Sequence, residues 1–167
     1  MRTKADSRIL CLIALLCVSI LSFACGCSHQ QTQKPEAAAA KPTLYDRLGG
    51  ARNIAMVVDD VIERAYVDPV FQANPRIRAA HEHFPKPIYK FEATCLACQA
   101  FGGPKIYTGR SLKEAHWHLN INETEWQELI KIFRDSMTSF KVPAREQGEV
   151  LAVIESTKSD IVHPAAK

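Results

Sequence analysis

The residues best suited to chemistry in this 167-residue sequence are histidines and cysteines. His116 is the sixth residue counted from Ser111, and Ser111 with Glu114 forms a capping box, which is typical of a helix start. A neutral imidazole on such a rigid mount could ligate a metal ion, although a histidine on a short helix is also a common structural residue. His118 competes for the role, but two residues turn a helix by about 200°, so we expect only one of them to face a given site.

Two further motifs could form functional sites, a redox-active cysteine pair and a zinc site. Cys95 and Cys98 have the spacing of a thioredoxin-type motif, but that motif follows a strand and none is expected here. Residues three apart on a helix hold their β-carbons about 5–6 Å apart, which is wider than a relaxed disulfide accepts. We therefore expect buried free thiols, which an oxidising compartment could still oxidise. His81 and His83 with His118 could bind zinc, but a fourth ligand is not visible.

Helices must position these side chains, because apolar residues recur at spacings of three and four along most of the chain. One such stripe runs through residues 51–67, a second through 126–140, and a third follows Pro143 as far as Ile161. No segment alternates cleanly between apolar and polar residues with a period of two. The sequence therefore predicts an all-α fold.

Prolines interrupt the stretch after the first of these helices. The breaks are expected at residues 68–69, 74–75 and 84–87, where the prolines are residues 69, 75, 85 and 87. Each proline predicts a break because the residue before it is disfavoured in a helix. We expect a less regular connection here. Residues 88–101 then form a predicted helix that is apolar on two sides, which indicates a position inside a bundle or between the core and a bound apolar ligand. Gly-Gly-Pro at 102–104 ends it.

The first 42 residues have a different composition. Three basic residues precede an uncharged apolar run, which is the layout of an export signal; a buried helix and an uncleaved membrane anchor are the alternatives. Small residues precede Cys25 and Cys27, as in a bacterial lipoprotein box, so either cysteine is a candidate for lipidation. We expect a signal or anchor at 1–27, an extended linker at 28–42 and one working domain at 43–167. The protein would then be exported and tethered on the periplasmic side of a membrane.

Composition excludes other classes of protein. The chain has 21 lysines and arginines against 18 acidic residues, a formal net charge of +3. That excess is too mild for a nucleic-acid-binding surface, so no nucleic-acid partner is expected. A hydrophobic content of 47% argues against disorder over most of the chain.

A specific pattern joins these observations. Gly-Gly-Pro-x-x-Tyr-Thr-Gly-Arg spans residues 102–110, and His116 follows six residues later. Further matching motifs are Leu-Tyr-Asp-Arg-Leu-Gly-Gly at 44–50, Val-Val-Asp-Asp at 57–60, Asp-Pro at 68–69, Val-Pro at 142–143 and Asp-Ile-Val at 160–162. In these motifs the sequence resembles the group I truncated haemoglobins, the two-over-two globins, from about residue 44 to residue 162.

The resemblance implies a truncated globin, a two-over-two helical sandwich around haem b, with His116 as the proximal iron ligand. The other face of the iron would be open for a diatomic gas. The helix at 88–101 becomes the distal helix, and a cation and a hydroxyl at the haem edge would suit the propionates. The residues expected around the haem are Ile62, Phe84, Tyr89, Ala93, Leu96, Tyr107, Arg110, Leu112, His116, Trp126 and Ile154.

The departures from the family pattern concern the distal side. Family members commonly carry an oxygen-binding tyrosine where this sequence has Ile62, and a glutamine where it has Ala93. The usual aromatic pair is replaced at 74–75, which leaves Phe84 as the ring expected to pack on the haem. Tyr89 is then the best remaining hydrogen-bond donor. Because fast NO dioxygenation relies on stabilised bound oxygen, the loss of the two usual donors weakens the case for that activity.

Three functions follow from this resemblance. The first is reversible binding of O₂, NO or CO. The second is a haem enzyme, an NO dioxygenase or peroxidase supported by a reductase. The third is a gas sensor tethered at the cell envelope, although no signalling domain is visible in the sequence.

Overall fold

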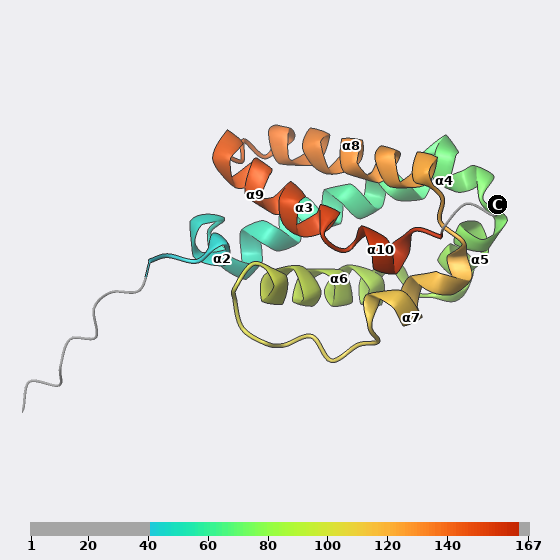
Figure 1. Cartoon of the computed structure of the whole chain (residues 1–167), viewed down its shortest axis with the longest axis horizontal. Coiled ribbons are helices and arrows are strands. Elements are labelled where there is room, and N and C mark those ends of the chain that lie inside the picture. The colour runs from blue at the N-terminus through green and yellow to red at the C-terminus, as the bar shows by residue number, and fades with distance from the viewer. Residues whose placement is uncertain (1–40, 164–167) are drawn as a thin grey trace, which may run out of the picture. The chain divides into compact units, whose positions relative to one another are not determined.

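The computed structural model describes residues 41–163. Four helices carry most of this part of the chain: α3 (Gly50–Val67), α6 (Lys86–Ala100), α8 (Glu123–Ser139) and α9 (Ala144–Glu155). Helix α3 packs against α6, α8 packs against α9, and a contact between α3 and α8 joins the two pairs (Figure 1). The predicted all-α, two-over-two architecture is therefore confirmed. Between residues 41 and 163 the only β-structure is an isolated parallel bridge from Ile121 to Val162.

Short helices connect the four long ones. They are α2 (Leu44–Arg47), α4 (Pro69–Ala73), α5 (Pro75–His83), α7 (Leu112–His116), the 3₁₀ turn η1 (Trp117–Leu119) and α10 (Lys158–Ile161). The predicted breaks at 68–69, 74–75 and 84–87 are present, but the segments between them are short helices and not an irregular connection. Asp68 and Asn74 each cap a new helix through the side chain, and the following proline takes the first helical position, where its missing N–H costs nothing. The apolar stripe after Pro143 is also divided, because α9 ends before the separate helix α10 begins.

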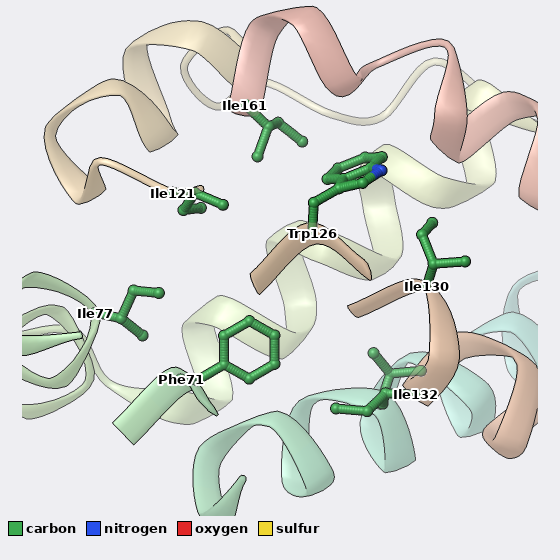
Figure 2. Close-up of a cluster of buried hydrophobic side chains, with 8 residues drawn as sticks. Phe71, Ile77, Ile121, Trp126, Ile130, Ile132 and Ile161 are labelled. Atoms are coloured by element: carbon green, nitrogen blue, oxygen red, sulfur yellow. The ribbon is translucent and has the colours of Figure 1, made fainter. Parts of the chain in front are cut away.

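Two clusters of buried side chains form the core. One surrounds Trp126, which has no exposed surface, and includes Phe71, Ile77, Ile121 and Ile161. Figure 2 shows the Trp126 ring between Ile161 and Ile130. The second cluster lies largely between α3, α6 and the C-terminal halves of α8 and α9; its members are Ile54, Val58, Ile62, Cys98, Phe101, Met137 and Val150. Several partly buried residues, including Phe133 and Ile154, pack against both clusters.

The short helix α7 is fixed at both ends. At its start, the Ser111 hydroxyl accepts a hydrogen bond from the Glu114 amide, and the Glu114 carboxylate accepts one from the Ser111 amide, as the capping box predicts. Beyond its end, the His163 amide donates to the Ile121 carbonyl at 2.8 Å, and the His163 ring bonds to the Trp117 carbonyl. The C-terminal segment therefore holds the segment that follows His116.

None of the helices between residues 41 and 163 is long and apolar enough to cross a membrane. The expected signal or anchor at 1–27, with Cys25 and Cys27, lies outside the described residues, as does the linker up to residue 40.

Candidate functional site

A large cavity of about 1010 Å³ runs between the helices of residues 41–163. Its walls come mainly from α3, α5, α6, α7, α8 and α9, and most of the side chains that line it are apolar. All of the residues expected around a haem border this cavity: Ile62, Phe84, Tyr89, Ala93, Leu96, Tyr107, Arg110, Leu112, His116, Trp126 and Ile154. The fold thus brings them together, while their contacts with a haem stay a prediction.

His116 is the last residue of α7, and its ring borders the cavity. Its Nδ1 lies 2.8 Å from the Leu112 carbonyl oxygen. Because a carbonyl only accepts, Nδ1 carries the proton and the lone pair is on Nε2. Nε2 makes no hydrogen bond to the described residues. Burial lowers the pKa of His116, although its bond to Leu112 opposes this, so the ring is held in the neutral form that ligates metals.

His118 also borders the cavity, which the helical spacing did not lead us to expect. Helix α7 ends at His116 and η1 continues in a 3₁₀ turn, so the angle for a regular helix does not apply across this boundary. His118 is nevertheless exposed, whereas His116 is half-buried. His116 is therefore the better placed ligand.

Another part of the cavity wall carries a group of aromatic rings that sequence analysis missed in part. Tyr66 of α3 stacks on His81 of α5, with ring centroids 3.7 Å apart and planes within 9° of parallel. The Tyr89 ring of α6 lies 6.4 Å from Tyr66. All three border the cavity. Tyr66 is one helical turn beyond Ile62, so its place on the same face of α3 was available from the spacing.

The Tyr89 side chain combines two properties. It has 37% of its surface accessible, yet burial raises the pKa of its phenol. The hydroxyl is therefore surrounded by protein, while other parts of the side chain stay accessible. Tyr89 stays protonated at neutral pH and can donate a hydrogen bond.

The edge of the cavity near residue 110 differs from expectation. The Tyr107 hydroxyl donates to the Arg110 carbonyl at 2.6 Å, so its proton is already used within the loop. A methyl group on Gly109 would lie 2.5 Å from that hydroxyl, which explains the glycine between them. The exposed Arg110 guanidinium is left as the group suited to an anion.

The other candidate sites do not form. Cys95 and Cys98 are buried free thiols, as predicted, and neither borders the cavity. Within residues 41–163 no cluster of three or more His, Cys, Asp or Glu side chains could hold a metal ion, so the zinc hypothesis finds no support there.

Comparison with known proteins identifies the family of this chain. A model of the bacterial-like globin family matches residues 43–163. The chain belongs to the bacterial-like globins. This globin is 26% identical over 125 residues to the group 1 truncated haemoglobin of Nostoc commune, covering 72% of its own length and 98% of the relative's.

Solved structures agree on the fold. The truncated haemoglobin of Tetrahymena pyriformis in its Fe(III) form superposes with a TM-score of 0.62 at 21% identity, covering 74% of this globin and all of that chain. The 2/2 haemoglobin of Synechococcus sp., in the cyanomet state with covalently attached haem, gives 0.64 at 19% identity, with 72% and 98% covered. The truncated globin fold is thereby confirmed.

Globins are haem proteins, and the cavity of this one suits a haem. Its lining is mainly apolar, as the porphyrin ring requires, and a neutral imidazole with a free nitrogen borders it. The site chemistry and the family therefore agree.

Proposed function

We propose that this globin holds haem b in the cavity through His116 and reversibly binds a diatomic gas, O₂ or alternatively NO or CO. The observation that carries the proposal is the His116 ring, whose Nδ1 is tied to Leu112 while Nε2 is left free beside the cavity. A bond of this kind fixes the tautomer and orientation of a histidine that ligates a metal. Haem supplies an iron that takes an imidazole on one face and a gas on the other.

The remaining cavity residues have supporting roles in this proposal. Ala93 and Leu96 of α6 would cover the distal face, while Leu112, Trp126 and Ile154 would close the proximal wall. Phe84, which is 42% exposed and borders the cavity, would pack on the ring. Arg110 would pair with a propionate. The haem would be held without a thioether bond to Cys95 or Cys98, since neither thiol borders the cavity.

An absorption spectrum tests the function directly. The purified, haem-loaded protein should show a five-coordinate ferrous spectrum after reduction, and addition of CO should convert it to a six-coordinate one. Failure to bind haem, or a spectrum that CO leaves unchanged, would contradict the proposal.

The gas-binding function also depends on a distal donor. Bound O₂ is more polar than CO, so a nearby O–H group retains O₂ selectively in a low-dielectric cavity. Tyr89 is the proposed donor, and one net hydrogen bond contributes about 0.5–1.5 kcal/mol. Tyr89→Phe should therefore speed O₂ dissociation roughly two- to tenfold and barely change CO dissociation, as measured by stopped-flow spectroscopy. Tyr66→Phe is the matched control, and an equal O₂ rate in wild type and Tyr89→Phe would remove Tyr89 from this role.

The N-terminal residues support a second proposal, which concerns location. The basic start, apolar run and cysteines at 25 and 27 suggest export and tethering at the periplasmic side. The full chain should then fractionate with membranes, whereas a variant lacking residues 1–42 should be released into the soluble fraction and still bind haem. A full-length chain found soluble and uncleaved would refute the tether.

A further inference from the structure

The His81 imidazole is unlike the other polar groups of the cavity wall. Its Nδ1 has no accessible surface and no hydrogen-bond partner among the described residues. Its ring borders the cavity, with one face covered by Tyr66 at 3.7 Å. A buried polar atom without a partner is costly to a folded protein and is found where the group has a function. His81 comes from α5, whereas His116 enters the cavity from α7.

No partner fixes the proton on either ring nitrogen. Nε2 is neither buried nor hydrogen-bonded to a described residue, so it is the nitrogen that a small molecule can reach. Since Nδ1 also has no partner, the single proton of the neutral ring can occupy either position. Nε2 is then able to accept a proton as well as to donate one.

Burial, more than the surrounding charges, keeps this ring neutral. Tyr66 of α3 and Lys86 of α6 lie nearest, with the Lys86 ammonium 4.4 Å from the Tyr66 ring centre and paired to Glu63 at 2.9 Å. Burial, and to a lesser extent the positive charge of Lys86, lower the pKa of His81. Further titratable groups on these elements are Tyr89 and Lys90 on α6, Arg78, Glu82 and His83 on α5, and His118 on η1, which packs against α5.

We propose that His81 is a proton acceptor in this cavity and that the site takes weakly acidic ligands HX, such as hydrogen peroxide, hydrogen sulfide or hydrogen cyanide. The H–X bond would break with its electron pair left on X, and the proton would pass to Nε2 of His81. A bound haem would supply the iron that takes X⁻. No electron is transferred. A positioned base can act directly or through one water. The inference rests on the proposed haem function and extends its ligands beyond neutral gases.

Cyanide association with the ferric, haem-loaded full chain tests the role, because near neutral pH the probe is almost entirely HCN. His81→Phe keeps an aromatic ring to stack on Tyr66, and His81→Gln keeps a hydrogen-bonding group; neither accepts a proton. Both variants should bind cyanide at least about tenfold more slowly, since general-base catalysis contributes about 10²–10⁴-fold. The wild-type rate should fall as the pH drops through the lowered pKa of His81, while both variants should lack that dependence.

Three comparisons make the outcome decisive. CO carries no proton, so CO association with the ferrous protein should stay within about twofold of wild type in both variants. His83→Gln is the matched control. His83 also borders the cavity, but it is exposed and its Nδ1 is bonded to the Ala79 carbonyl of its own helix; its cyanide rate should be unchanged. A wild-type cyanide rate in His81→Gln would overturn the proposal and leave His81 as a hydrogen-bonding group. Absence of haem from the wild-type protein would instead refute the proposed function.

Discussion

His116→Ala should abolish the five-coordinate ferrous haem spectrum. Among residues 41–163, the substitution removes the one ring that combines partial burial beside the cavity with a free nitrogen opposite a fixed Nδ1 proton. The ligand bond to iron is then lost, while the capping box at Ser111 and Glu114 and the rest of α7 are retained. Absorption spectra of the reduced variant at matched haem concentration measure the effect.

Two controls make this result specific. Added imidazole should restore a normal spectrum to His116→Ala, because the space left by the side chain has the shape of the lost ring. His118→Ala should leave the spectrum nearly intact, since that ring is exposed. If His118→Ala were the variant that loses haem, His116 would not be the ligand.

Trp126→Ala should lower the free energy of unfolding by about 3–5 kcal/mol, the usual cost of replacing a buried aromatic residue with alanine. Trp126 has no exposed surface, lies at the centre of its cluster and donates from Nε1 to Glu155 at 3.2 Å. Urea unfolding at equal haem loading measures the loss. Trp117→Ala is the matched control: Trp117 is 48% exposed and its ring is tilted against that of His163, so its removal should cost no more than about 1.5 kcal/mol. Equal losses in the two variants would contradict the placement of Trp126.

Local features of this globin were predictable from the sequence. The helices at 51–67 and 126–140 follow from apolar spacing, and α7 follows from its capping box, because both signals depend on residues within a few positions of one another. The end of the first long helix at Asp68 was equally clear. A proline alone, however, does not show that the chain after it is irregular. Pro69 and Pro75 each begin a helix, because an Asp or Asn cap precedes each of them.

Non-local features of the site were not predictable in the same way. The stack of Tyr66 on His81 joins α3 to α5, two helices separated by α4, and no spacing within either helix indicates it. The Tyr107 hydroxyl was assigned to the haem edge from its type and position, but the loop closes so that the Arg110 carbonyl takes its proton. Side chains on loops and on separate helices are placed by tertiary packing, which motif spacing does not describe.

The cavity of about 1010 Å³ has a thermodynamic consequence for the whole molecule. The two core clusters meet around a space that the chain alone does not fill, so the protein has fewer internal contacts than a closed core of the same size would give it. A group that enters this space and binds only the folded chain raises the free energy of unfolding with the logarithm of its free concentration. Haem bound in this cavity would therefore complete the core, and the free energy of unfolding would rise with the concentration of free haem.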